Sequence, residues 1–314
     1  MAQNKVQFQQ GLSLDEFLAA YGTEQQCCDA VFAMRWPNGF SCAECGHTAY
    51  NSLKNGRLLT CQRCHHRNYL TAGTIFADTK LPLTKWFLAM YLLTRDKQGL
   101  SALQLMRDLG VRYPTAWLLK QKLMVVMHER VAEKPLSGQA VADDVYFGGK
   151  REGKRGRGAV NKVPAVVAVS LNAEGKPDQA SFRVVTGFTL RGLRDWAQQA
   201  LTAGMRLESD GLACFRAVTQ MGVQHQPVVM KQDLSQRDTG VFAWVNTVIG
   251  NLKTALLGTY HHVSQKYLGR YLAEFEYRFN RRYDLKTLLP RLLHAAVHTP
   301  AYPNPILTLI PSSG

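Results

Sequence analysis

The chain has 314 residues, of which 46% are apolar and 19% are charged. A chain of this length usually forms about two domains, and this composition supports folded hydrophobic cores rather than extended disorder. Lysine and arginine outnumber aspartate and glutamate by 38 to 23, which gives a net charge of +15. Such an excess favours a polyanionic partner, either a nucleic acid or an acidic membrane surface.

The sequence predicts no membrane span, because no apolar run approaches the ~20 residues that a spanning helix needs. The first ten residues, MAQNKVQFQQ, lack the apolar stretch of a secretory signal. We therefore expect a cytoplasmic protein whose seven cysteines do not form a disulfide framework.

The first segment, residues 1–35, is predicted to be helical. Leu14, Phe17 and Leu18 recur at helical spacing and place apolar side chains on one face. Cys27 and Cys28, near the end of this segment, match no metal-binding pattern and are predicted to be buried thiols.

Residues 36–80 contain two Cys-x-x-Cys pairs. The second pair follows the first after fifteen residues, and the four cysteines are Cys42, Cys45, Cys61 and Cys64. Two pairs at this separation bring four thiolates into the tetrahedron that a structural zinc ion requires. A module this small has a weak hydrophobic core, so the metal would supply folding energy. The segment therefore predicts a zinc ribbon.

Residues 81–134 return to helical periodicity. The run SALQLMRDLG, a turn at Gly110 and the run YPTAWLLKQKLM together favour a helix-turn-helix. Arg112 and Lys120 fall where the second helix of such a motif faces DNA. An ordinary helical hairpin is the alternative interpretation.

Strand-like sequence begins after Pro135 and gives way to helical sequence over residues 240–295. The predicted strands are residues 139–147, 164–171, 179–185, 205–209 and 225–230. This order indicates a mixed domain of strands and helices over residues 135–298, followed by a Pro-rich tail at 299–314.

Acidic residues interrupt two of these strands. Asp143 and Asp144 lie inside an apolar run, and Asp210 ends a short strand before Gly211. Neighbours on a strand face opposite sides, so only one of the two adjacent aspartates should meet Asp210. Converging carboxylates would need a hard cation, Mg²⁺ or Mn²⁺, and a basic protein with such a site suits phosphoryl transfer by two metal ions. Taken singly, each aspartate is more often a residue of a turn or a strand edge.

At these positions the sequence resembles the DDE-superfamily transposases of bacterial insertion sequences, in the group with an N-terminal zinc ribbon (the insertion sequence fifteen-ninety-five family). The resemblance covers nearly the whole chain. Its landmarks are the cysteine pairs, the motif DDVYFGGKREGKRGRG, Asp210-Gly211, and the block WVNTVIGNLKTALLGTYHHVSQKYLGRYLAEFEYRFNRR. It implies a multidomain α+β or α/β protein with an RNase H-like catalytic core, in which helices flank a mixed sheet.

The resemblance also implies the catalytic residues. Asp143, rather than Asp144, and Asp210 would bind two Mg²⁺ or Mn²⁺ ions. The third ligand is usually glutamate, but the matching position here is Asn246, separated from Asp210 by thirty-five residues. Lys253 lies two helical turns further on the same face and would contact DNA near the cut end.

The asparagine leaves alternatives open. Its carbonyl oxygen can bind Mg²⁺, but it carries no negative charge and cannot act as a base. Glu274 or Glu208 is the alternative third acid, and a helix N-cap is the alternative role of Asn246.

Basic residues cluster in the glycine-spaced run KREGKRGRG, in the helix-turn-helix and in the C-terminal block, where aromatic residues accompany them. A solvated basic surface is the alternative. The predicted DNA contacts are Lys150, Arg151, Lys154, Arg155, Arg157, Arg112, Lys120, Arg278, Arg281 and Arg282.

The sequence thus supports the hypothesis of a transposase that hydrolyses a phosphodiester at the element ends and transfers the strand to target DNA. Its partners would be double-stranded DNA, as terminal inverted repeats and target, and further copies of itself assembled on that DNA, with no membrane partner. The alternatives are a non-catalytic zinc-ribbon and helix-turn-helix regulator, and a nuclease or resolvase on the same fold.

Overall fold

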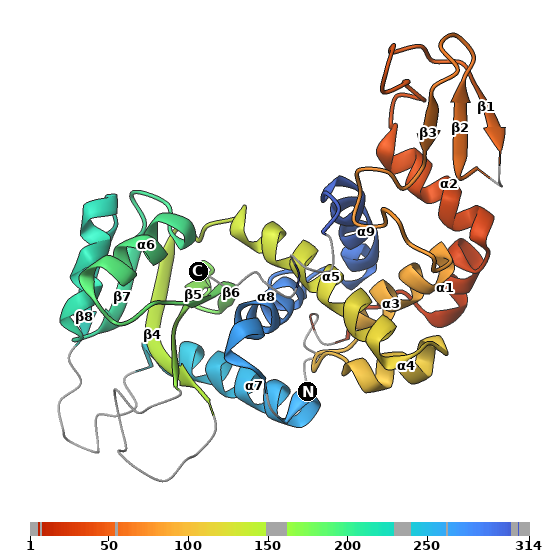
Figure 1. The fold of residues 1–314 in the computed structure, drawn as a ribbon. Helices are drawn as coiled ribbons and strands as arrows, with labels where there is room; N and C mark the ends of the chain where they lie inside the picture. Colours follow the sequence, from red (N-terminus) through yellow and green to blue (C-terminus); the bar gives the residue numbers. More distant parts are fainter. Residues whose placement is uncertain are drawn as a thin grey trace. The chain divides into compact units, whose positions relative to one another are not determined.

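The computed structural model describes residues 6, 8–53, 56–148, 162–228, 240–261, 263–302 and 307. The chain divides into two compact units (Figure 1). The first contains Met1–Asp96, Leu100–Val126 and Arg281–Leu309; the second contains Lys97–Gly99, Met127–Asn280 and Ile310–Gly314. This division is coarser than the five segments expected from the sequence, whose boundaries stay a prediction.

The first unit is mainly helical. Its first two helices each begin with a capping box, in which Ser13 pairs with Glu16 and Thr23 with Gln26. The helices wholly within this unit are α1 (Leu14–Tyr21), α2 (Glu24–Arg35), α3 (Leu83–Arg95), α4 (Ala102–Leu109) and α9 (Leu288–His298). A 3₁₀ helix, η4 (Leu285–Thr287), precedes α9. Cys27 and Cys28 are buried on α2, as predicted.

The zinc-ribbon segment forms a small antiparallel sheet in the order β1-β2-β3. Its strands are β1 (Tyr50–Leu53), β2 (Leu58–Cys61) and β3 (Arg67–Tyr69). Phe40 and Leu59 form its small buried core, against which Trp36 and Tyr50 pack. This core is as small as the sequence suggested, which is consistent with the expectation that a metal ion adds to its stability.

The predicted turn between two helices is confirmed at Gly110. This residue has a left-handed backbone (φ 62°) and closes α4, where its N–H donates to the carbonyls of Met106 and Arg107. The next helix, α5 (Tyr113–Ala132), follows after two residues, and the boundary between the two units falls within it.

The second unit contains a five-stranded sheet in the order β6-β5-β4-β7-β8. The strands are β4 (Gln139–Phe147), β5 (Val163–Leu171), β6 (Pro177–Val184), β7 (Arg206–Asp210) and β8 (Gln224–Val228). The first three in sequence pair antiparallel, whereas β7 is parallel to β4 and β8 to β7. The sheet is therefore mixed, as the resemblance implied, with β4 at its centre.

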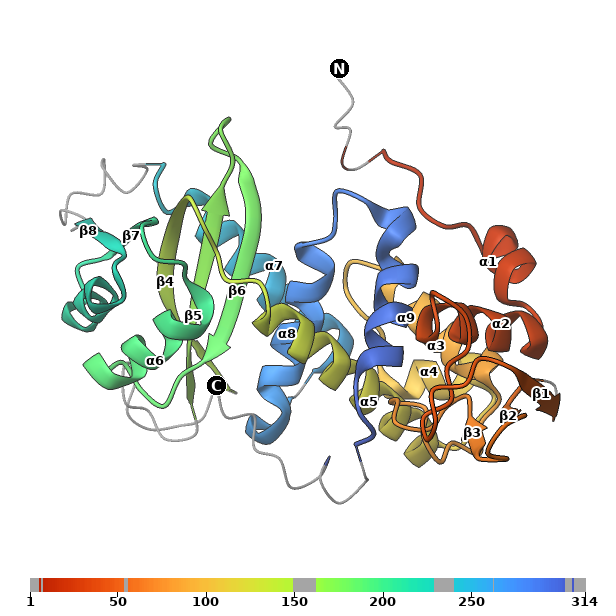
Figure 2. The same ribbon diagram turned by 90° about the horizontal axis from the view of Figure 1, so that it is seen from above.

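Helices cover both faces of this sheet (Figure 2). Against one face lie α6 (Leu190–Ala200) and the 3₁₀ helix η1 (Ala213–Met221), whose core includes Ala140, Ala142 and Leu207. Against the other lie α7 (Ala243–Tyr260) and α8 (Leu268–Phe279), with a core that includes Val141 and Val145. The short 3₁₀ helix η3 (Gln265–Tyr267) precedes α8. Alternate residues of β4 therefore enter two different cores, as expected of a strand buried on both faces.

None of the described helices combines the length and the apolarity that crossing a membrane requires.

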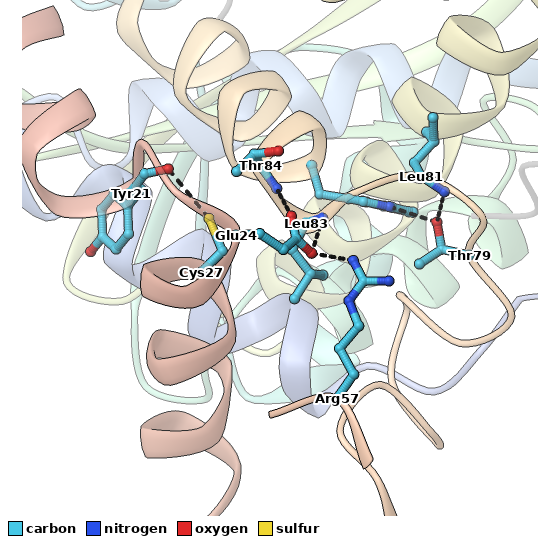
Figure 3. Close-up of polar contacts among 9 residues, drawn as sticks. Tyr21, Glu24, Cys27, Arg57, Thr79, Leu81, Leu83 and Thr84 are labelled. Atoms are coloured by element: carbon cyan, nitrogen blue, oxygen red, sulfur yellow. Dashed lines mark hydrogen bonds and ion pairs between the residues drawn. The ribbon is translucent and has the colours of Figure 1, made fainter. Parts of the chain in front are cut away.

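Glu24, the first residue of α2, links three parts of the first unit (Figure 3). Its carboxylate accepts hydrogen bonds from the backbone N–H groups of Leu83 (3.0 Å) and Thr84 (3.2 Å), at the start of α3. It also forms an ion pair with Arg57, next to strand β2 of the ribbon. Pro82, the N-cap residue of α3, provides no side-chain cap. Glu24 therefore caps α3 from outside the helix and connects it to the ribbon.

We expect Glu24→Ala to lower the free energy of unfolding by about 1–3 kcal/mol, because two N–H groups and a guanidinium lose a partly buried acceptor. Denaturant unfolding followed by tryptophan fluorescence measures the loss. Asp29→Ala, which changes an exposed carboxylate on the same helix, is the matched control. Equal losses for the two variants would contradict the capping role.

Candidate active site and zinc cluster

The parallel pairing of β4 with β7 positions the candidate carboxylates. The paired residues run from Gln139 and Arg206 to Ala142 and Ser209. Asp143 and Asp210 are the next residues on each strand, and neighbours at one level of a parallel ladder point to the same face. Strand β7 ends at Asp210, whose carboxylate accepts a hydrogen bond from the backbone N–H of Leu212 (3.3 Å).

The structure brings three carboxylates together. Asp143, Asp144 and Asp210 are all half-buried, and their ligand oxygens lie within 4.8 Å of one another. The expectation that only one of the adjacent aspartates would meet Asp210 is wrong. The ladder with β7 ends at Ala142, and beyond it the described part of the chain places no strand on that side of β4. Both side chains can therefore reach this open edge.

The electrostatics of the cluster favour a cation. Burial raises the pKa of the Asp143 carboxyl to about 6, and the charges of Asp144 and Asp210 act in the same direction. The N–H of Asp144, which donates to Oδ1 of Asp143 (2.9 Å), and the charge of Lys253 oppose this shift. Closely packed carboxylate oxygens are the donor set of a hard divalent ion, so these residues fit Mg²⁺ or Mn²⁺.

Helix α7 carries Asn246 and Lys253 on one exposed face, two turns apart. The charge of Lys253 lowers the pKa of Asp143, so Lys253 lies near that carboxylate. Asn246 is not a helix cap, because α7 begins at Ala243 with Phe242 as its N-cap residue. The N–H of Asn246 makes an ordinary helical hydrogen bond to the carbonyl of Phe242 (2.9 Å).

Neither alternative acid belongs to this cluster. Glu274 is buried on α8, where it pairs with Arg278 (2.7 Å) and accepts a hydrogen bond from the Tyr260 hydroxyl (2.9 Å). Glu208 lies on β7, where the amide of Gln139 donates to its carboxylate (3.4 Å). The structure therefore gives Glu274 a separate structural partner and leaves Glu208 outside the group of three.

The four ribbon cysteines form a second candidate metal cluster, with all sulfurs within 4.8 Å of one another. The sulfurs of Cys42 and Cys64, and those of Cys45 and Cys61, are each 3.6 Å apart. Asn68 supports the cluster, because its amide lies 3.6 Å from the Cys42 sulfur and its carbonyl oxygen accepts the N–H of Ala43. No motif in the sequence marked Asn68 for this role.

The two halves of the cluster share one backbone pattern. In the first, the N–H of Cys42 donates to the carbonyl of His47, and the N–H of Gly46 donates back to Cys42. In the second, Cys61 donates to His66, and His65 donates back to Cys61. Gly46 and His65 occupy equivalent positions and both have positive φ, 69° and 58°. This repeated geometry points both pairs of sulfurs toward one centre.

Two residues that were predicted to contact DNA are buried, so the prediction is wrong for them. Lys120 is only 1% exposed, and its ammonium donates to the carbonyl of Leu100 (2.6 Å). Arg278 is 8% exposed and pairs with Glu274, four residues earlier on α8. That spacing is typical of a helical ion pair and could have been recognised in the sequence. Neither side chain is placed to contact a phosphate.

The other predicted DNA contacts differ in position. Arg112 is exposed immediately before α5. Arg281 is half-buried, and the guanidinium of Arg282 lies 4.3 Å from the ring centroid of Tyr283. The basic run after β4 lies outside the described residues, and with it Lys150, Arg151, Lys154, Arg155 and Arg157.

Comparison with protein families agrees with this arrangement. A model of the ISXO2-like transposase domain matches residues 135–280, and a model of the transposase zinc-ribbon domain matches residues 22–67. The chain carries both domains of an insertion-sequence transposase. The family expected from the sequence is thereby confirmed, and the three carboxylates, Asn246 and Lys253 all lie in the transposase domain.

A relative in a mobile element supports the same family. Over 281 residues this chain is 24% identical to an uncharacterized protein in transposable element ISH50 of Halobacterium salinarum, covering 83% of this chain and 92% of that protein. The zinc-ribbon match and the four-cysteine cluster together support a structural zinc ion.

We expect purified protein to contain one zinc ion per chain, measured by elemental analysis. Cys45→Ser should reduce this value, because three thiolates bind zinc less tightly than four. Cys214→Ser, which changes a buried cysteine outside the cluster, should leave it at one. Well under one zinc in the unmodified protein, with four freely titrating thiols, would contradict the assignment.

Proposed function

We propose that this protein is a DNA transposase that uses divalent metal ions to hydrolyse a phosphodiester at the ends of its element and then joins the freed 3′ end to target DNA. The observation that carries the proposal is the convergence of Asp143 and Asp210 where the parallel β4–β7 ladder ends. This pair lies within an ISXO2-like transposase domain.

The proposed roles follow from position. Asp143 and Asp210, with Asn246, would hold Mg²⁺ or Mn²⁺, and two ions are expected. Such ions would activate the attacking oxygen and stabilise the leaving one. Lys253, whose charge already acts on Asp143, would bind a phosphate beside the scissile bond. The sheet and α7 would keep these groups fixed relative to one another while DNA binds.

We propose double-stranded DNA as the partner, first as the terminal inverted repeats of the element and then as the target. The net charge of +15 suits this polyanion. Exposed Arg112, half-buried Arg281 and Arg282, and the basic run at 150–157 are the proposed phosphate contacts. We also propose that several copies assemble on the DNA, because a transposase has to bring two element ends together.

A non-catalytic DNA-binding regulator is the second candidate. The observation that favours it is Asn246, which gives α7 no carboxylate at the position where most relatives are expected to carry glutamate. The two candidates make the same prediction for DNA binding and opposite predictions for strand cleavage.

We expect Asp143→Asn and Asp210→Asn each to reduce cleavage of a duplex carrying the element end by more than about 100-fold, because each removes a proposed metal ligand. DNA affinity should change little, since neither carboxylate binds phosphate directly. Asp195→Asn, on α6, is the matched control. Normal cleavage by both variants would exclude the enzyme and leave the regulator.

DNA binding should depend steeply on salt. If about six phosphates are neutralised, affinity should fall roughly 10³-fold between 50 and 200 mM salt. Arg112→Ala should reduce the slope of log affinity against log salt by about one, because it removes one phosphate contact. A fluorescence anisotropy titration measures both quantities. Affinity that stays flat over this range would contradict a charge-dominated interface.

A further inference from the structure

We infer that Asp144 is a third metal ligand of the transposase and supplies the carboxylate that Asn246 lacks. The inference rests on the proposed function, because it concerns the same metal site. It adds Asp144 to the expected ligand Asp143 and does not replace it.

The first argument is the position of Asp144 on the strand. Asp144 belongs to the side of β4 that carries Ala142, whereas Asp143 belongs to the side that carries Val141 and Val145. Carboxylates from opposite faces would normally point apart. Here their oxygens lie within 4.8 Å of each other and of Asp210. The three groups therefore approach one point from both faces of the sheet.

The second argument is the rigidity of this edge. Pairing of β4 with β5 continues past the cluster, from Asp143 and Val167 through Asp144 and Val166 to Phe147 and Val163. The backbone of Asp144 is therefore fixed on one side, although the ladder with β7 has ended on the other. The Asp144 N–H also holds Oδ1 of Asp143 (2.9 Å). The Asp143 carboxylate is thus oriented before any ion binds, and the backbone of Asp144 is fixed beside it.

The third argument is charge. With Asp143 and Asp210 alone, two carboxylates would face two divalent ions, and the neutral amide of Asn246 would add no charge. Asp144 raises the negative charge of the ligand set by one, which strengthens binding of a hard cation. Asn246, exposed on α7, then has to add only its neutral carbonyl oxygen to the ligand set.

The test measures Mn²⁺ binding to the full, zinc-loaded chain without DNA, by calorimetry and by electron paramagnetic resonance. Asp144→Asn should weaken Mn²⁺ binding at least about 10-fold, and Asp144→Glu, which keeps the charge, should bind within a few-fold of the unmodified protein. Asn246→Ala should weaken Mn²⁺ binding less than Asp144→Asn does, because it removes a neutral ligand. Asp195→Asn is the control for an unrelated carboxylate.

Thermal unfolding without metal shows whether the variants fold. Asp144→Asn should raise the Tm slightly, because it removes one of three closely packed like charges. Added Mn²⁺ should then raise the Tm of the unmodified protein more than that of Asp144→Asn.

Two results would overturn the inference. One is a folded Asp144→Asn variant with unchanged Mn²⁺ affinity while Asp143→Asn loses binding, which leaves the proposed function intact. The other is loss of Mn²⁺ binding by Asn246→Ala as large as that of Asp143→Asn. If the unmodified protein binds no Mn²⁺, the metal site of the proposed function fails as well.

Discussion

The parallel register between β4 and β7 is the constraint on which the carboxylate cluster depends. Pairing of Ala142 with Ser209 makes Asp143 and Asp210 the next residues at one level and on one face. A shift of one residue would turn one of them to the opposite face. The register is held by burial, since Ala142 and Leu207 belong to one core and Val141 to the other. Apolar side chains that take no part in the proposed chemistry therefore set the distance between the acidic groups.

The point where the ladder ends matters as much as its register. Beyond Ala142, no strand among the described residues pairs with β4 on the side of β7. This open edge gives the carboxylates room to converge, but their convergence also brings like charges close together. Lys253 on α7 opposes this repulsion in part, because its charge favours the ionised form of Asp143. A stable fold thus tolerates a site that is electrostatically incomplete without a cation.

Local features of the fold could be predicted from the sequence. The predictions that proved wrong concern side chains that can be accommodated in more than one way. Cysteine spacing predicted the four-sulfur cluster, and periodicity located the strands, but the expectation that Asp143 and Asp210 share a metal site came from the resemblance. Strand alternation failed at Asp144 because it assumes a partner on both sides. Helical periodicity failed at Lys120 because an aliphatic stem can be buried while its ammonium binds a carbonyl.

The two candidate metal clusters differ in the way that separates structural from reactive sites. Four thiolates complete the tetrahedron of a zinc ion and leave no position for a substrate, so that metal can only hold the ribbon together. The three carboxylates would fill part of the roughly six positions around Mg²⁺ and would leave others for water and phosphate oxygens. Because Asp143, Asp144 and Asp210 are half-buried, these open positions would face an accessible edge of the sheet. Under the proposed function, the same chain uses soft sulfur ligands for folding and hard oxygen ligands for phosphate chemistry.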